Sequence, residues 1–275
     1  MGGVQDEHGE KVRESQRQVR YDYKNRLEGM MRKFSWMLLV LLAFSVYAED
    51  EKEVVIESLE GLKGVTAKKI IWKKDGAKMV SIPGGNKTKP FWIDTTEVTV
   101  GQFKKFLLES DHQFDTKLWR NIYRFSATDK SPIIYVSWDD AKAYAKWAGR
   151  RLPREEEWEW AARGGLKDKI YPWGDNRSQA RDYANYDGAG GKDKWKYCAP
   201  VGSFEANGYG LHDMAGNVWE WSQDWYDDNR TRYRLLRGGC WINDIKALNV
   251  ANRCSPAPYF RQSYIGFRCV VSGSP

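Results

Sequence analysis

Hydrophobic positions recur with strand or helix periods from residue 79 onward. Residues 79–85 form an apolar run that ends in Pro-Gly-Gly, and residues 91–94 form a second run, which predicts two strands. Thr99 lies at an N-cap position, and Phe103, Phe106 and Leu107 after it share one helical face. The pattern therefore predicts a helix that packs on the two strands.

Two further helices are predicted in the middle of the chain. Ser137, with Asp140 three positions later, starts the first helix, and Gly149 ends it. Pro153 starts the second at a position that needs no amide donor, and three glutamates suit its positive end. The residues of this second helix that we expect to pack inward are Trp158, Trp160 and Ala161. From residue 171 onward the pattern predicts turns and short strands held by aromatic side chains.

The stretch from Leu235 to Arg268 departs from these patterns. Its two ends, Arg237 to Trp241 and Ile265 to Arg268, combine tight-turn glycines with large side chains that a buried backbone needs. The middle, from Ile242 to Tyr264, has neither strand alternation nor a helical stripe, and it mixes Asn, Asp, Ser, Pro, Tyr and Phe. That composition is typical of a loop surface presented to a ligand.

The beginning of the chain predicts export. Residues 1–29 are polar and charged, and we interpret them as an upstream extension or a mis-assigned start. Residues 30–48 have the basic start, short apolar run and small-residue end of a signal peptide, with a buried core helix as the alternative. The run is too short for an ordinary membrane span. Residues 49–75 are expected to be a tether or one accessory strand, before a domain at 76–273.

Composition favours an irregular, loop-rich domain with a tryptophan-rich core. The 275 residues include 14 Trp and 25 Gly, and 41% are hydrophobic, which argues against a helical bundle or a regular α/β sheet. The net charge of +7 is spread along the chain, so we expect no nucleic-acid partner, and contact with a membrane only by surface association.

Cysteine spacing excludes a zinc site. The chain has no CxxC pair, and in an exported protein one or two disulfides are plausible, with the pairing left open. The four cysteines are Cys198, Cys240, Cys254 and Cys269.

A series of short motifs resembles the formylglycine-generating enzyme (sulfatase-modifying factor) family. The motifs occur in consistent order from about residue 78 to residue 271. They include Ile82-Pro83-Gly84-Gly85, Glu97-Val98-Thr99, Arg151-Leu152-Pro153, Asn207-Gly208-Tyr209-Gly210-Leu211, Gly216-Asn217-Val218-Trp219-Glu220-Trp221, Arg237-Gly238-Gly239 and Gly266-Phe267-Arg268. The resemblance implies an α+β fold, the irregular C-type lectin-like fold of that family.

The resemblance also implies that catalysis has been lost. Enzymes of the family bind copper through two cysteines beyond the Arg-Gly-Gly turn, and those positions here are Asn243 and Leu248. Neither side chain offers the sulfur that Cu(I) prefers, so we expect no copper and no enzymatic activity. An iron site of the sulfoxide-synthase type would need a histidine cluster, and the three histidines are scattered. Cys240 and Cys254 remain open as a displaced redox pair, a disulfide or buried thiols.

Calcium is the cofactor that the resemblance implies, in a structural role. One family site corresponds to the side chains of Asp213 and Glu220 with the carbonyls of Gly216 and Val218. A second corresponds to Asn185, Asp193 and the carbonyls of Tyr186 and Trp195. Such hard oxygen ligands suit Ca²⁺. The alternative is that these carboxylates hydrogen-bond turn amides.

The last stretch is similar to a branch of the family whose members are diversified by retroelements that randomise adenines. In that branch a fixed Arg-Gly-Gly-x-Trp and a fixed Ile-Gly-Phe-Arg enclose a variable middle, and here the variable region is about 237–268. Randomised AAC codons never give Trp, Glu, Gln, Lys or Met, and between residues 242 and 264 only Lys246 and Gln262 break that rule.

The resemblance therefore predicts an exported ligand-binding protein at the cell surface, in the periplasm or secreted. Its partner is expected to be a protein or glycan, such as one on another cell. The residues that we place on the binding face are Ile242, Asn243, Asp244, Leu248, Ser255, Tyr259, Phe260, Ser263 and Tyr264. An enzyme of the family and a structural envelope protein are the alternatives.

Overall fold

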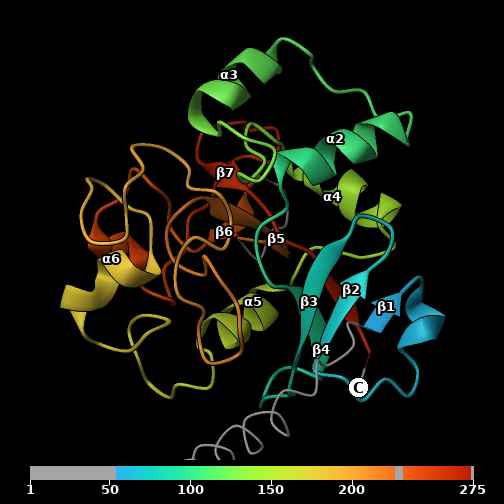
Figure 1. Ribbon diagram of the computed structural model, residues 1–275, viewed down its shortest axis with the longest axis horizontal. Helices are drawn as coiled ribbons and strands as arrows, with labels where there is room; N and C mark the ends of the chain where they lie inside the picture. The colour runs from blue at the N-terminus through green and yellow to red at the C-terminus, as the bar shows by residue number, and fades with distance from the viewer. Residues whose placement is uncertain (1–53, 227–231, 274–275) are drawn as a thin grey trace, which may run out of the picture. The chain divides into compact units, whose positions relative to one another are not determined.

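The computed structural model describes residues 54–226 and 232–273 (Figure 1). A five-stranded sheet has the order β1-β2-β3-β4-β8. Its strands are β1 (Val54–Ile56), β2 (Lys69–Trp72), β3 (Ala77–Ile82), β4 (Phe91–Asp94) and β8 (Val270–Ser272). β1 and β2 are parallel, and the remaining neighbours are antiparallel. The sequence predicted β3 and β4 at nearly these bounds.

The segment expected to be a tether or one accessory strand supplies two strands of the domain. Residues 54–72 supply β1, the 3-10 helix η1 (Leu59–Leu62) and β2. Their apolar side chains are buried, because Ile56, Ile70 and Trp72 pack with Met79 and Trp92 of the neighbouring strands. The domain therefore begins near residue 53 rather than at 76. The predicted signal peptide at residues 30–48 lies outside the described residues.

The predicted helices form where their caps indicate. They are α2 (Val100–Leu108), α4 (Trp138–Trp147) and α5 (Glu155–Ala162), and Figure 1 also shows α3 (Leu118–Phe125), which the sequence pattern did not predict. Thr99 and Ser137 each accept a backbone N–H in a capping box. The third predicted helix starts at Glu155, two residues after Pro153, with Arg154 at its N-cap. None of the described helices is long and apolar enough to cross a membrane.

A second, three-stranded sheet has the order β6-β5-β7. β5 (Trp219–Trp225) lies in the centre, with β6 (Arg234–Arg237) antiparallel and β7 (Ile265–Gly266) parallel to it. The residues between β6 and β7 therefore form a long loop whose two ends are both fastened to β5. After β7 the chain enters β8, which pairs with β4. The C-terminal segment thereby ties the long loop to both sheets.

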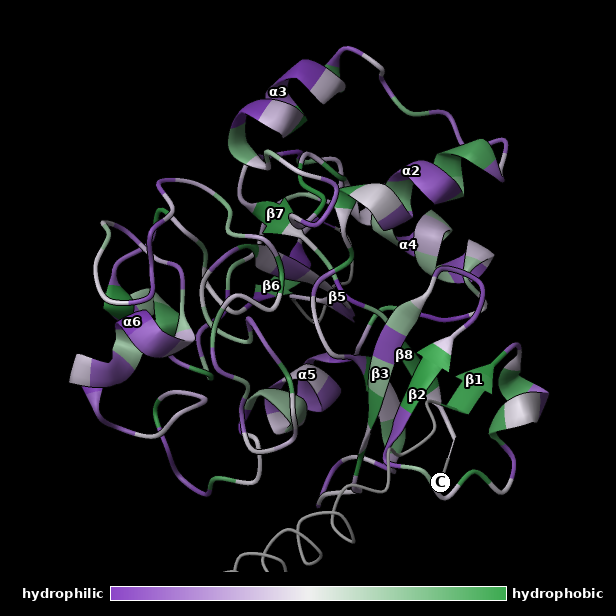
Figure 2. Cartoon of the chain, viewed as in Figure 1, coloured by the Kyte–Doolittle hydropathy of each residue, from purple (hydrophilic) through white to green (hydrophobic). Residues whose placement is uncertain are grey.

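Large aromatic side chains fill the core, as composition predicted. Trp72, Trp92, Trp158 and Trp221 are all among the largest fully buried side chains. Figure 2 shows hydrophobic residues gathered on strands such as β1, β3 and β7, while the connecting loops and the short helix α6 (Ala180–Tyr183) are largely hydrophilic. Two further 3-10 turns, η2 (Arg177–Gln179) and η3 (Ile245–Leu248), lie in those loops.

Candidate functional site

The long loop of residues 238–264, here called the recognition segment, is the candidate site. It contains η3 and is otherwise without regular structure. It leaves β6 through Gly238 and Gly239, which have φ values of 100° and 77°. A Cβ atom added at Gly239 would lie 2.9 Å from the Cδ2 atom of Leu248. Only glycine therefore permits this close turn.

Arg237 at the end of β6 binds the backbone of the recognition segment. Its Nη1 donates to the carbonyl oxygens of Ala251 and Asn252, both at 3.0 Å, and its Nη2 donates to that of Val250 at 2.6 Å. Nη2 also forms an ion pair with Glu159 of α5. The Arg237 side chain is fully buried. One framework guanidinium therefore holds three consecutive carbonyls of the segment.

Framework N–H groups hold the rest of the segment in the same way. Seven carbonyl oxygens of the segment accept backbone hydrogen bonds from residues outside it, at 2.8–3.0 Å. The pairs, donor first, are Gly216 and Gly238, Asp187 and Asn243, Leu236 and Cys254, Arg234 and Pro256, Trp138 and Pro258, Tyr135 and Gln262, and Trp219 and Tyr264. Backbone bonds do not depend on side-chain identity, so the path of the segment is insensitive to the residues that it carries.

The nine predicted binding residues differ in exposure. Tyr259 is 75% exposed, Ile242 44% and Phe260 41%, so all three present large apolar surface to solvent. Asp244 is exposed, but its carboxylate also caps η3. The four half-buried members are Asn243, Ser255, Ser263 and Tyr264.

Leu248 is a correction to the predicted binding face. It is 1% exposed and packs with Tyr171, Ala184 and Ala215 in a small apolar cluster. Its placement follows from η3, which turns this apolar side chain inward beneath Gly239. Leu248 therefore supports the segment from below and does not contribute to its exposed surface.

Asn243 and Leu248, the two positions that the resemblance assigns to catalytic cysteines, make structural contacts. The Oδ1 atom of Asn243 accepts from the backbone N–H of Cys240 at 3.0 Å and from its thiol at 3.1 Å. Burial raises the pKa of Cys240 to about 12. All four cysteines are free thiols, and Cys254 alone is exposed. The neighbourhood therefore offers a protonated, buried thiol where copper chemistry needs thiolates.

In the first predicted calcium site, the carboxylates of Glu220 and Asp213 accept hydrogen bonds from different protein donors. Both oxygens of the Glu220 carboxylate bind Arg268, at 2.7 and 2.8 Å, and one also accepts from Trp158 at 2.8 Å. Asp213 accepts from the Gly202 N–H at 2.7 Å, and its other oxygen is buried without a partner. Gly216 and Val218 lie in the turn between them and are buried. The Glu220 carboxylate is thus fully occupied by donors from the protein.

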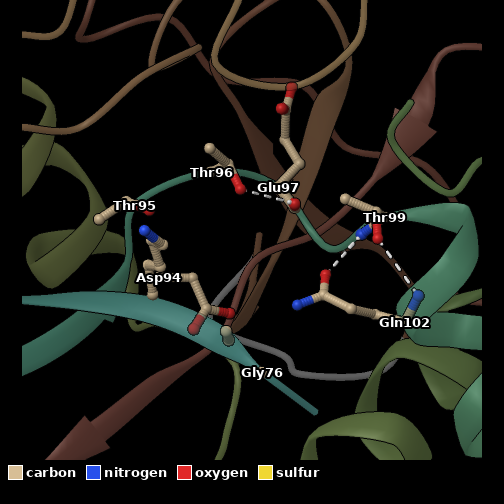
Figure 3. Close-up of a pocket in the computed structure, with 9 residues that line it drawn as sticks. Gly76, Asp94, Thr95, Thr96, Glu97, Thr99 and Gln102 are labelled. Carbon is tan, nitrogen blue, oxygen red and sulfur yellow. Dashed lines mark hydrogen bonds between the residues drawn. The ribbon is translucent and has the colours of Figure 1, made fainter. Parts of the chain in front are cut away.

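Glu97 is a buried carboxyl that sequence reasoning did not single out. This residue lines a cavity of about 170 Å³, and Figure 3 shows its carboxylate pointing away from the Thr99–Gln102 capping box. Its Oε1 accepts from Asn217 at 3.1 Å, and among the described residues its Oε2 is buried without a partner. Burial, followed by the charge of Asp213, raises the pKa of Glu97 well above its usual value. The cavity is smaller than usual ligand pockets, which measure about 300–1,000 Å³.

The second predicted calcium set lies in the loop of residues 185–195. Asn185 and Asp193 are buried, whereas Tyr186 and Trp195 are half-buried. The loop contacts the recognition segment directly, because the N–H of Asp187 donates to the Asn243 carbonyl at 2.9 Å. Arg181 reaches into this loop from α6. Within the described residues, no group of three or more His, Cys, Asp and Glu side chains is arranged to hold a metal ion.

The sequence matches the family model described as the sulfatase-modifying factor enzyme 1-like domain over residues 72–272. The chain belongs to this family. Its relatives include some that are named inactive and others that are named as formylglycine-generating enzymes. The mouse inactive C-alpha-formylglycine-generating enzyme 2 is 42% identical over 151 residues, which cover 51% of this chain and 49% of that relative. The formylglycine-generating enzyme of Streptomyces coelicolor is 32% identical over 246 residues, covering 66% of this chain and 78% of the enzyme.

Solved structures support the same fold for this sulfatase-modifying factor domain. Treponema denticola variable protein 1 superposes with a TM-score of 0.57 at 23% identity, covering 74% of this chain and 98% of that protein. The chain thus has the irregular C-type lectin-like, α+β fold that its motifs implied. Membership of the family does not decide activity, since the chain spans only about half of the length of the mouse relative.

Proposed function

We propose that this chain is an exported ligand-binding protein in which the recognition segment forms a variable binding surface. The observation that supports this most is that the backbone of the segment is attached to the framework while several of its large side chains are exposed. Its backbone is held by Arg237 and by framework N–H groups, whereas Ile242, Tyr259 and Phe260 are exposed. Aromatic side chains anchor many protein interfaces. The fold shared with a protein named as variable agrees with this proposal.

A matched pair of displayed libraries tests the proposal. The first library randomises five positions of the segment that are not buried: Ile242, Asp244, Ser255, Tyr259 and Phe260. The second randomises five buried positions: Trp158, Leu236, Leu248, Val250 and Ile265. We expect most members of the first library to fold and to yield binders to an arbitrary probe such as streptavidin, while most members of the second fail to fold. Equal folding losses in both libraries would contradict the proposal.

Loss of the family's oxidase chemistry is the second part of the proposal. Asn243 and Leu248 supply no sulfur, and the raised pKa of Cys240 keeps that thiol protonated at neutral pH. We expect no copper-dependent oxygen uptake with a cysteine-containing peptide. Uptake that Cys240→Ser abolishes would restore the enzyme hypothesis.

Diversification by a retroelement is the proposed origin of the variability. It is supported by the residue types of the segment, in which Lys246 and Gln262 are the exceptions to the AAC-codon rule. The adjoining DNA tests it. We expect a reverse-transcriptase gene and a near-copy of the segment's coding sequence that differs at adenines, and absence of both would exclude this mechanism.

Export rests on the signal-peptide pattern of residues 30–48. We expect the processed protein to begin at Glu49, which N-terminal sequencing of the secreted or periplasmic product would show. A product that retains residues 30–48 would argue against cleavage.

A further inference from the structure

Arg181 places its guanidinium inside the loop of residues 185–195. Its Nη1 donates to the carbonyl oxygens of Tyr186, at 2.9 Å, and Gly188, at 3.0 Å, and to the carboxylate of Asp193. Its Nη2 donates to the carbonyl oxygen of Asp187. The guanidinium carbon lies 3.5 Å from the centroid of the Tyr186 ring. The loop thus wraps three consecutive carbonyls and one carboxylate around a single cationic group.

This arrangement conflicts with a calcium ion at the second predicted site. Two of the four implied ligands, the Tyr186 carbonyl and the Asp193 carboxylate, are the groups that Arg181 binds. Calcium needs its oxygen ligands at about 2.3–2.6 Å, and a guanidinium bonded to the same oxygens fills that space. It would also repel the ion, since two like charges at such a distance interact strongly away from bulk water. The residues present therefore do not fit calcium while Arg181 is in place.

Asn185, the remaining implied side-chain ligand of this loop, has an amide oxygen that Arg181 does not reach. Its Nδ2 donates to the Tyr197 carbonyl at 2.7 Å, which fixes the orientation of the amide. Among the described residues, its Oδ1 is buried and has no hydrogen-bond partner. A buried acceptor without a partner is costly. Arg181 therefore satisfies the carbonyls of residues 186–188 and the Asp193 carboxylate but leaves this one oxygen of the loop unpaired.

We propose that Arg181 is a built-in replacement for the calcium ion of this loop. Its guanidinium neutralises Asp193 and satisfies the loop carbonyls, so the loop folds without a metal ion. The consequence reaches the recognition segment, because Asp187 of this loop donates its N–H to the Asn243 carbonyl. The loop that positions Asn243 is therefore independent of calcium. This inference does not rest on the proposed function.

Thermal unfolding of the full chain in excess EGTA and in excess calcium tests the replacement. We expect calcium to raise the Tm of Arg181→Ser by about 5–10 °C more than it raises that of the wild type, because the serine variant frees the oxygens of Tyr186 and Asp193. Adding Asp193→Asn to Arg181→Ser should abolish the extra rise. Arg177→Ser is the matched control, since Arg177 is exposed in the preceding turn η2. Equal calcium shifts in Arg181→Ser and the wild type would overturn the proposal.

Equilibrium dialysis against calcium provides a second measurement that does not require Arg181→Ser to fold. We expect wild type and Asp193→Asn to bind the same number of calcium ions, because Asp193 of the wild type already pairs with Arg181. One ion fewer in Asp193→Asn would mean that calcium occupies the loop of the wild type, and the proposal would be wrong. Ions bound elsewhere in the chain cancel in this comparison.

Discussion

The recognition segment and the framework that holds it both contain large aromatic side chains but use them differently. In the framework, large side chains such as Trp158 and Trp221 are buried and define the structure by packing. In the segment, Tyr259 and Phe260 are exposed, and the structure is defined by backbone carbonyls bound to the framework. Side-chain identity is therefore essential in the framework and at buried positions of the segment such as Leu248, and dispensable at the exposed positions of the segment. This difference is what a changeable binding surface requires.

Two arginines, one buried and one half-buried, each fix an irregular loop by binding three of its consecutive backbone carbonyls. Arg237 binds the carbonyls of residues 250–252 and pairs with Glu159, and Arg181 binds those of residues 186–188 and pairs with Asp193. In each case a planar cation with several donors satisfies consecutive carbonyls that have no strand partner. Irregular backbone is thereby fixed without regular secondary structure.

Arg237→Met should produce the largest effect, because it removes the framework's hold on the segment. It leaves the carbonyls of residues 250–252 without their donor and Glu159 without this partner. We expect a loss of about 3–5 kcal/mol in the free energy of unfolding, measured with urea. Arg253→Met is the control, since Arg253 makes an exposed ion pair with Glu155 that is worth about 1 kcal/mol or less. Similar losses in both variants would refute the assigned role of Arg237.

Leu248→Ala and Ile242→Ala compare a buried and an exposed aliphatic side chain within the recognition segment. Leu248 is 1% exposed, so its truncation should cost about 2–4 kcal/mol in urea unfolding. Ile242→Ala removes a similar aliphatic side chain that is 44% exposed, and we expect a change within about 0.5 kcal/mol. If the two variants lose equal stability, burial does not separate supporting from presenting residues in this segment.

Local sequence signals predicted the parts of the fold that local interactions determine. Thr99 and Ser137 marked helix starts because a capping side chain acts within one turn. α3 was missed because its N-cap, Lys117, makes no capping bond, and its polar residues hide the single fully buried side chain, Ile122. The sequence predicts a tether or one accessory strand where β1 and β2 lie, because the lysines and glutamates around them are charged. Their inward residues find partners only in β3 and β4, which no local pattern shows.

The candidate site was predictable in location but not in detail. The absence of a periodic pattern between residues 242 and 264 predicts the recognition segment. Tyr259 and Phe260 are predicted on its surface, and both are exposed in the structure. Leu248 was misplaced because the turn at Gly239 that covers it depends on long-range geometry. The sequence did not single out Arg181 and marked Arg237 only as part of a motif at one scaffold end, since an arginine in a sequence does not show which carbonyls it will reach.

Thiol reactivity tests whether the framework and the segment differ in accessibility as well as stability. Cys254 of the segment is exposed, whereas Cys198, Cys240 and Cys269 are buried. We expect a disulfide reagent to label one thiol per native chain rapidly and the other three at least about 100-fold more slowly, because those need local or global opening. Cys254→Ser should remove the fast phase. A chain with no titratable fast thiol and two fewer thiols after unfolding would instead indicate a Cys240–Cys254 disulfide.

A small effect per substitution is also expected in the simultaneous variant Ile242→Ser, Tyr259→Ser and Phe260→Ser. These three side chains are 44%, 75% and 41% exposed, and the nearest framework N–H groups to Tyr259 and Phe260 donate to the Pro258 and Gln262 carbonyls. Each substitution should change the free energy of unfolding by about 0.5 kcal/mol or less, so the Tm should move by no more than a few degrees. The variant should still fold cooperatively in a melting curve. A much larger loss would mean that the exposed aromatics stabilise the segment, and a surface that depends on its own side chains could not be freely varied.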